Sequence, residues 1–307
     1  MSYSARMQKN HLYSVLLAPR GAIRMADVGA QIAQMYLSPY DNLIGVIGEA
    51  GSGKSMLLKG MFPGLELTND DSGVNVRPLP IMDLDDTGFF KPHTYHLDIR
   101  FEQGFYQLGD LAEAIEAALK LNRRVIVEHF DLIYPVLKRN AHLLLGVGEE
   151  IIITRPSVFG PEPQEVADIV MPSVIFRKMA HSAEDLVEHE LSLMGIGRFD
   201  HDDVRHGFIL SFENKPEIDI PALEAKVKEK IAANLPISYK DDYHITIGDI
   251  VHYCTGPRMH VEATGDIKHF TLHPEFIKES ITGRYQLVGI VGFQYDSQLS
   301  DLNQIIP

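Results

Sequence analysis

Residues 42–62 read NLIGVIGEAGSGKSMLLKGMF. Residues 43–47 form an apolar run that predicts a buried strand, and residues 55–62 predict the start of a helix. The loop between them fits the pattern G-x-x-x-x-G-K-[ST]. Its residues are Gly48, Glu49, Ala50, Gly51, Ser52, Gly53, Lys54 and Ser55. The sequence therefore predicts a strand, a glycine-rich loop and a helix in succession over these residues.

The glycines of this loop suit it to binding an anion. Several backbone N–H groups must converge on a triphosphate, and glycine permits that concave path without Cβ clashes. The N-terminus of the following helix adds partial positive charge. In such loops the lysine contacts the β- and γ-phosphates, and the hydroxyl group holds Mg²⁺. We therefore predict a site for ATP or GTP with Mg²⁺, in which Lys54 and Ser55 have these roles.

Length and composition limit the class of protein. The 307 residues, 45% of them hydrophobic, predict about two domains with sizeable cores. No apolar run approaches the roughly 18 residues of a membrane span, so we expect no membrane partner. One cysteine, Cys254, favours a reducing, cytoplasmic location. The net charge of −14 argues against broad nucleic-acid binding, and the composition carries no signal for an oligomeric state.

Strands and helices alternate through the first half. Further strands are predicted at residues 94–101, 124–128 and 151–154, helices at 25–37 and 108–121, and an extra edge strand at 16–24. This order predicts an α/β domain over residues 1–170, a three-layer P-loop NTPase fold with a mainly parallel sheet and ligands at the carboxyl ends of its strands. The expected linker contains Pro156, Pro161, Pro163 and Pro172.

The second half, residues 171–307, predicts a smaller α+β domain. Helices are expected at residues 181–194 and 221–235, and strands at 207–213, 258–263, 266–272 and 285–293. Strands that cluster after helices, rather than alternating with them, favour this class.

A carboxylate is expected near the loop of residues 48–55, which is called the phosphate loop below after its predicted role. P-loop enzymes hold Mg²⁺ with the loop hydroxyl and with an acidic residue at the end of a neighbouring strand. Glu128 ends such a strand, and Asp131 is the less favoured candidate. The alternative is that Glu128 only caps the next helix.

A second acidic segment follows about thirty residues after Lys54. Residues 82–90 read MDLDDTGFF and contain Asp83, Asp85 and Asp86. Three carboxylates in four positions repel one another unless a cation or solvent relieves them. A metal ligand and a general base would both use such a group, and a solvated acidic loop is the alternative.

Three segments, GEAGSGKS, DLDDTGFF and VIVEHFDLIYPVLKRNAHLLL, together resemble P-loop kinases of the uridine kinase and phosphoribulokinase group. That group has an acidic residue followed by aromatic residues, and a strand that ends in Glu before a Leu-rich helix. The resemblance implies that Asp86 or Asp85 is the base for a substrate hydroxyl and that Glu128 lies beside Mg²⁺. His129 stands where the group has Gly. The candidates for its arginine-rich lid are Arg139 and Arg155.

The second half contains residues with metal-ligating chemistry. His181 and Asp185 are four positions apart and share one helix face, which His189 continues. Cys254 and His260 follow in a distant segment. Two ligands from a helix and two from a loop can build a tetrahedral zinc site, because each pair fixes one edge. Each residue could instead be an ordinary surface or core residue.

The order of segments over residues 175–293 resembles the second additional domain of alanyl-tRNA synthetases, which also forms free-standing editing proteins. That family reads His-x-x-x-His on a helix and later Cys-x-x-x-His-x-x-x-Thr-Gly-Glu-Ile. Here His181 begins the first segment, and Cys254 and His260 precede TGDI in the second. Asp185 stands where the family has its second histidine, and the Cys–His spacing is two residues longer. The resemblance implies a zinc site and a site for an aminoacyl-adenosine or tRNA end.

Three functions fit these patterns. The leading hypothesis is an ATP-binding P-loop protein, an ATPase or a phosphotransferase with a small acceptor, coupled to an editing-like domain. The second is a zinc-dependent aminoacyl-tRNA editing hydrolase that nucleotide regulates. The third is a nucleotide-switched binding protein without chemistry of its own.

Overall fold

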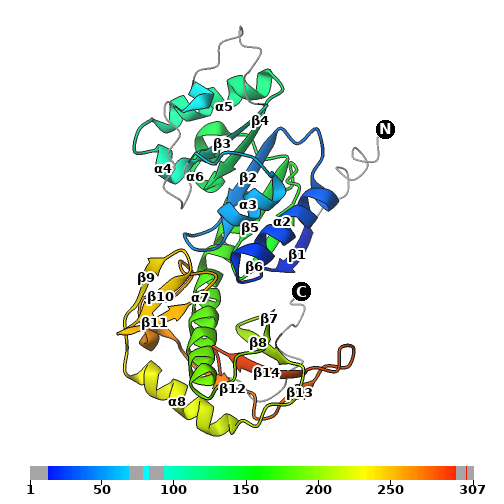
Figure 1. Ribbon diagram of the computed structural model, residues 1–307. Coiled ribbons are helices and arrows are strands. Elements are labelled where there is room, and N and C mark those ends of the chain that lie inside the picture. Colours follow the sequence, from blue (N-terminus) through cyan, green and yellow to red (C-terminus); the bar gives the residue numbers. More distant parts are fainter. Residues whose placement is uncertain (1–12, 69–78, 83–92, 295–301, 303–307) are drawn as a thin grey trace. The chain divides into compact units, whose positions relative to one another are not determined.

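The computed structural model describes residues 13–68, 79–82, 93–294 and 302. These residues fall into two compact units (Figure 1). One unit is drawn from residues 1–18 and 23–172, and the other from residues 19–22 and 173–307. Each unit is described by itself below.

The first unit is built on a six-stranded mixed sheet. Its strands are β1 (Tyr13–Leu17), β2 (Leu43–Ile47), β3 (Thr94–Asp98), β4 (Arg124–Glu128), β5 (Leu143–Val147) and β6 (Glu150–Thr154). Their order is β1-β6-β5-β2-β4-β3. Strands β5, β2, β4 and β3 run parallel, whereas β6 pairs antiparallel with β5 and β1 pairs antiparallel with β6. The predicted α/β class is confirmed at this level.

Helices cover both faces of the sheet. They are α2 (Ala22–Tyr36), α3 (Lys54–Met61), α4 (Ile99–Glu102), α5 (Leu108–Lys120), α6 (Phe130–Leu137) and α7 (Pro163–Leu193), with a short 3₁₀ turn, η1 (Pro80–Met82). Leu43 and Ile47 of β2 pack with residues of α5, α6 and α7. Ile44 and Val46 pack with α2 and α3 instead. Strand β2 is therefore buried at every residue, as a strand in the middle of a covered sheet must be.

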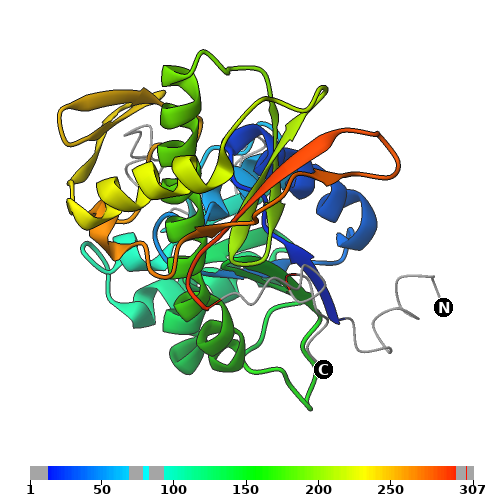
Figure 2. The same ribbon diagram turned by 90° about the horizontal axis from the view of Figure 1, so that it is seen from below.

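The second unit combines helices with antiparallel strands. The strands are β7 (Asp200–Val204), β8 (Gly207–Phe212), β9 (Ile237–Asp241), β10 (His244–Ile247), β11 (Ile250–Tyr253), β12 (Thr271–Leu272), β13 (Ile277–Lys278) and β14 (Tyr285–Ile290), and the helices are α8 (Ile220–Ala232) and the 3₁₀ turn η2 (Thr264–Asp266). One sheet has the order β12-β14-β8-β7, and β11-β10-β9 form another. Helix α8 packs against the second half of α7, as Figure 2 shows.

Several expected elements differ from the structure. The edge strand expected at residues 16–24 is β1, which lies earlier, at Tyr13–Leu17. Most of the expected range is wrong, because helix α2 begins at Ala22. Residues 258–263 form turns and one isolated bridge at Ala263 rather than a strand. None of the described helices combines the length and the hydropathy that a bilayer span requires.

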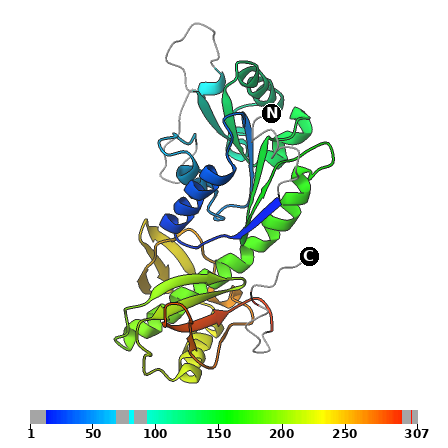
Figure 3. The ribbon, with the colours of Figure 1, turned by 90° about the vertical axis from the view of Figure 1, so that its right-hand side faces the viewer.

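The proline-rich segment is mostly helix rather than linker. Helix α7 begins at Pro163 and runs through Pro172 without a break (Figure 3). Proline suits the first turn of a helix, where its missing N–H would have no partner. Pro172 removes a backbone hydrogen bond inside the helix, a loss that 31 residues of continuous helix tolerate.

Arg20 explains why residues 19–22 belong to the second unit. Its guanidinium lies 3.2 Å from the Glu184 carboxylate and 2.9 Å from that of Asp203. It also donates a hydrogen bond of 2.8 Å to the carbonyl oxygen of Gly207. These contacts are buried, so the positive charge and its two partners stabilise one another.

Arg155 has a structural role and is not available as a lid residue. Its guanidinium makes bonds of 2.6 and 2.8 Å to the two oxygens of Asp41. Both side chains are buried. Asp41 precedes β2, at the end opposite the phosphate loop, so the pair lies away from that loop. Arg139, the other candidate, forms a half-exposed ion pair with Glu116 at 3.1 Å.

We expect Asp41→Ala to lower the free energy of unfolding of the first unit by about 3–5 kcal/mol, because it leaves the Arg155 guanidinium buried without its counter-ion. Glu116→Ala is the matched control, since it breaks a solvated pair and should cost at most about 1 kcal/mol. Urea denaturation measures both. Equal losses in the two variants would show that the buried pair contributes no more than the exposed one.

Candidate functional site

The phosphate loop joins β2 to α3, as the sequence predicts. Gly51 and Gly53 have φ angles of 79° and 95°, which glycine adopts without strain. A Cβ atom on Gly48 would lie 2.4 Å from the carbonyl oxygen of Val147 and 2.9 Å from Ser52 Oγ. The backbone path of the loop therefore requires glycine at these three positions.

Lys54 lies folded over the loop that precedes it. Its Nζ donates a hydrogen bond of 3.0 Å to the carbonyl oxygen of Glu49 and lies 3.9 Å from Glu128 Oε2. Burial lowers the pKa of Lys54, while the negative charge of Glu128 opposes that change. The ammonium group is thus held among oxygen atoms of the protein, which phosphate oxygens could replace.

Glu128 ends β4, next to β2, and reaches the start of α3. Ser55 Oγ lies 3.5 Å from Glu128 Oε1, and His96 Nε2 lies 3.1 Å from the same oxygen. The N–H of Thr68 donates to His96 Nδ1 at 3.1 Å. The imidazole proton is therefore on Nε2, where it is donated to Glu128. Burial tends to raise the pKa of Glu128, but His96 and Lys54 hold it below its usual value.

His129, rather than Glu128, is the N-cap residue of α6. Its φ angle is 56°, in the left-handed region that glycine enters most easily. Glycine would adopt this backbone conformation with less strain than histidine does. Burial, followed by the charge of Lys54, lowers the pKa of His129 to about 4. The imidazole beside the loop is therefore neutral near pH 7.

Asp98 is a further acidic group that the sequence did not single out. The predicted strand at residues 94–101 ends early, at Asp98, which pairs with Glu128 in the parallel ladder. Its carboxylate accepts a hydrogen bond of 3.2 Å from the N–H of Phe101 and caps α4. Its negative charge also acts on Lys54 and His129. The sequence signal for Asp98 is a carboxylate at the carboxyl end of a short strand.

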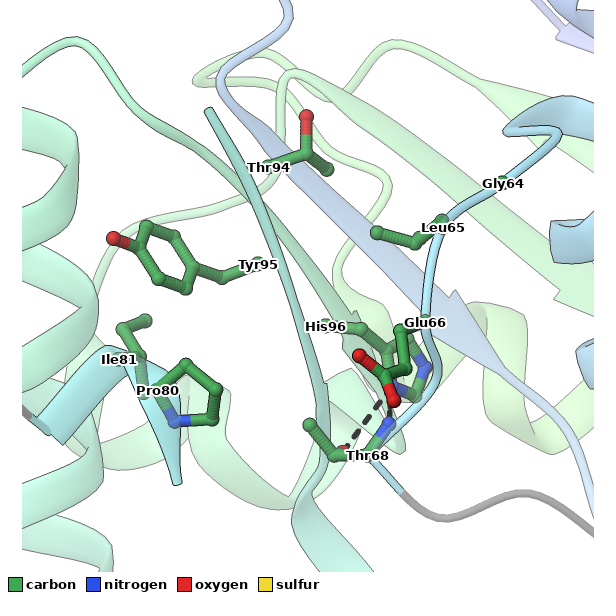
Figure 4. Close-up of a pocket in the computed structure, with 9 residues that line it drawn as sticks. All are labelled: Gly64, Leu65, Glu66, Thr68, Pro80, Ile81, Thr94, Tyr95 and His96. Carbon is green, nitrogen blue, oxygen red and sulfur yellow. Dashed lines mark hydrogen bonds between the residues drawn. The ribbon is translucent and has the colours of Figure 1, made fainter. Parts of the chain in front are cut away.

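The acidic segment predicted to contain the catalytic base lies between two described parts of the chain. Asp83, Asp85 and Asp86 lie outside the described residues, which end at Met82 and resume at His93. A cavity of about 230 Å³ lies along β3 (Figure 4). Its lining residues are Gly64, Leu65, Glu66, Thr68, Pro80, Ile81, Thr94, Tyr95 and His96. Because His96 also binds Glu128, the cavity adjoins the carboxylate beside the phosphate loop.

The four predicted zinc ligands of the second unit come together. His181 and Asp185 lie on α7, whereas Cys254 and His260 lie after β11. One ligating atom of each residue lies within 4.8 Å of those of the others. His181 Nε2 is 3.2 Å from Cys254 Sγ, and His260 Nε2 is 2.8 Å from Asp185 Oδ2. The segment between Cys254 and His260 forms a turn, in which the N–H of Met259 donates a hydrogen bond of 3.0 Å to the carbonyl oxygen of Gly256. This turn accommodates the two extra residues.

The hydrogen bonds around this cluster fit a bound cation. His260 Nδ1 lies 3.3 Å from the carbonyl oxygen of Pro257, and its Nε2 faces the carboxylate of Asp185. A neutral imidazole has a single N–H and cannot donate to both oxygens. Burial, with the charge of Asp185, raises the pKa of the Cys254 thiol, whereas the N–H of Gly256 favours the thiolate. A metal ion would satisfy the imidazole, the carboxylate and the thiolate together.

Comparisons with known proteins identified no family for this chain. A scan against models of protein families found no match, and a search of curated proteins found none either. The geometry of the phosphate loop and of the cluster of His181, Asp185, Cys254 and His260 is therefore the basis for a function.

Proposed function

We propose that the chain binds a Mg²⁺–nucleoside triphosphate in the loop of residues 48–55 and transfers or hydrolyses its terminal phosphoryl group. The first unit would then have a P-loop NTPase fold of the kinase type. The convergence of Lys54, Ser55 and Glu128 supports this: the ammonium lies 3.9 Å and the hydroxyl 3.5 Å from the carboxylate. Lys54 would bind phosphate oxygens, while the loop N–H groups orient the triphosphate.

Ser55 and Glu128 would hold the Mg²⁺. This ion prefers oxygen ligands and is usually bound through one or two carboxylates together with phosphate oxygens and water. His96 fixes the orientation of the Glu128 carboxylate, and Thr68 fixes His96 in turn. Such outer partners keep a metal-ligating group in place.

The cavity along β3 favours a phosphotransferase over a simple ATPase. It has both apolar and polar lining residues, and His96 connects it to Glu128. A small hydroxylated acceptor bound there would lie beside the carboxylate that we assign to Mg²⁺. Asp86, the proposed base, follows η1 by four residues, and Pro80 and Ile81 of η1 line the cavity.

We expect Glu128→Gln to raise the Mg²⁺ concentration for half-maximal ATP turnover by about 10- to 100-fold, because a contact to a charged group contributes about 1.5–3 kcal/mol. Glutamine keeps the shape of the side chain and removes its charge. Asp131→Asn is the matched control, since burial already raises the pKa of Asp131 and weakens it as a ligand. If this Mg²⁺ concentration rose in Asp131→Asn and not in Glu128→Gln, Asp131 would be the Mg²⁺ ligand instead.

Product analysis distinguishes the proposed activities. ADP and free phosphate are measured with Mg²⁺–ATP, and GDP and free phosphate with Mg²⁺–GTP, first with the nucleotide alone and then with nucleosides, sugars or amino acids added. ADP in excess of phosphate, seen only with an acceptor, identifies a phosphotransferase. Equal amounts of both products without an acceptor identify an ATPase. Nucleotide binding with no ADP under any condition would identify a nucleotide-switched binding protein.

For the second unit, we propose a zinc ion bound by His181, Asp185, Cys254 and His260 and a role in binding an aminoacyl-adenosine end. Four protein ligands complete a tetrahedral set, as in structural zinc sites. That arrangement favours binding over editing hydrolysis on this ion. A cytoplasmic location would keep the Cys254 thiol reduced. If the zinc-loaded protein hydrolysed aminoacyl esters, the second unit would be an editing hydrolase rather than a binding domain.

A further inference from the structure

A second set of ligating side chains adjoins the proposed zinc site. Asp185, Glu188 and His252 each place one ligating atom within 4.8 Å of the others. Asp185 and Glu188 are three positions apart on α7, and His252 lies on β11. Asp185 belongs to both sets. We propose that the second unit binds two divalent cations that share the Asp185 carboxylate, an inference that rests on the zinc site proposed above.

The two oxygens of Asp185 face different histidines. Oδ2 lies 2.8 Å from His260 Nε2, in the first set. Oδ1 lies 3.8 Å from His252 Nε2, in the second. A carboxylate can bind one cation with each oxygen, whereas an imidazole directs a single lone pair toward a site on one side. Asp185 is therefore the residue in this cluster whose geometry suits a bridge.

His252 has an unused nitrogen aimed at this position. Its Nε2 is buried and finds no hydrogen-bond partner among the described residues. The 3.8 Å separation from Asp185 Oδ1 is too long for a hydrogen bond. Buried nitrogen atoms are nearly always paired, and an unpaired one calls for an explanation such as a missing ion. A cation between His252 and Asp185 would coordinate this nitrogen.

Glu188 supplies the third ligand and is already held in place. Its Oε1 lies 3.2 Å from His201 Nδ1. His201 also lies 3.2 Å from Glu184, whose charge Arg20 balances. One of its carboxylate oxygens lies within 4.8 Å of the ligating atoms of Asp185 and His252. Anchored in this way, Glu188 resembles a ligand whose outer partner fixes its orientation.

The two positions differ in their access to water. The first has four protein ligands, and its side chains are nearly enclosed. The second has three, and the side chains of His252 and Glu188 are 12% and 18% exposed. Three protein ligands leave a coordination position for water or for an oxygen of a bound molecule. Two carboxylates and an imidazole accept Zn²⁺ or Mn²⁺. The second cation is thus the one that could contact a ligand.

Metal stoichiometry of the full chain tests the proposal. The protein is loaded with Zn²⁺, dialysed against metal-free buffer and weighed by native mass spectrometry. We expect two ions in the wild type and one in each of His252→Ala, Glu188→Gln and Asp185→His. In Asp185→His the imidazole can complete the first set but cannot bridge. His189→Ala is the matched control and should keep two ions, because His189 only contacts the His252 ring at its edge.

The outcomes separate this inference from the proposed zinc site. One ion in the wild type, unchanged in His252→Ala and Glu188→Gln, would overturn the second position and leave the first. No ion in the wild type would refute both. Two ions that persist in all three variants would show adventitious binding elsewhere and overturn the second position. Cobalt substitution adds a readout, since the thiolate–cobalt absorption of Cys254 should survive in His252→Ala and disappear in Cys254→Ser.

Discussion

Lys54→Ala is expected to reduce nucleotide turnover by about 10²–10³-fold, the typical cost of removing one group that stabilises developing charge. The ammonium group lies in a buried position, where its interaction with phosphate oxygens is stronger than in water. No other lysine in the phosphate loop could replace it. The measurement is steady-state ADP formation at saturating Mg²⁺.

Two further variants separate the role of this lysine from general effects of charge and folding. Lys120→Ala removes the same charge from the exposed end of α5 and should leave turnover within about twofold, because a solvated charge contributes little. Lys54→Arg keeps the positive charge and still gives the buried Glu128 carboxylate a partner, so the variant should stay folded. A loss of turnover in Lys54→Arg would show that the position of the ammonium group matters as well as its charge. If Lys54→Ala turned over nucleotide at the wild-type rate, Lys54 would have no role in the reaction and the reaction would occur at another site.

Loss of the zinc ion should have the second large effect. Binding of structural zinc is worth about 10–16 kcal/mol in small zinc domains, and whole domains are stable by only about 5–15 kcal/mol. The second unit also has a hydrophobic core of its own, so we expect a partial rather than a complete loss. Cys254→Ser should therefore lower its free energy of unfolding by about 5 kcal/mol or more.

Chelation provides the control for Cys254→Ser. EDTA should shift the urea transition of the wild-type second unit at least to that of the variant. It should shift the variant much less, because the variant can bind an ion only at Asp185, Glu188 and His252. Serine is close to cysteine in size, so a change in packing contributes little. A wild-type transition that does not respond to EDTA would contradict the zinc assignment, since the ion would then make no contribution to stability.

The strand, loop and helix over residues 42–62 could be predicted because their pattern is local. Other elements lacked such a signal. Residues 143–147, LLLGV, are a short apolar run that fits a buried helix as well as a strand, and they form β5 beside β2. Strand β9 is exposed at four of its five residues, so it shows little apolar alternation. The start of helix α7 lies in a segment whose four prolines predict a linker, because proline rarely lies inside a helix.

The candidate sites show the same division between local and distant information. Ligand spacing pointed to His181, Asp185, Cys254 and His260, and the structure brings these four together. The shared role of Asp185 depends on β11 packing beside α7, which no sequence pattern indicated. His96 contacts Glu128 only through the pairing of β3 with β4. Its signal was a polar residue at a buried position of an apolar strand.

Isothermal titration of the wild-type chain with a non-hydrolysable ATP analogue and Mg²⁺ tests the phosphate site most directly. We expect saturable binding to one site. The affinity should fall at least about tenfold when EDTA removes the Mg²⁺ and again in Lys54→Ala, which corresponds to about 1.4 kcal/mol or more in each case. The absence of binding by the wild type, or equal affinities in the wild type and Lys54→Ala, would contradict the assignment of residues 48–55 as a nucleotide site.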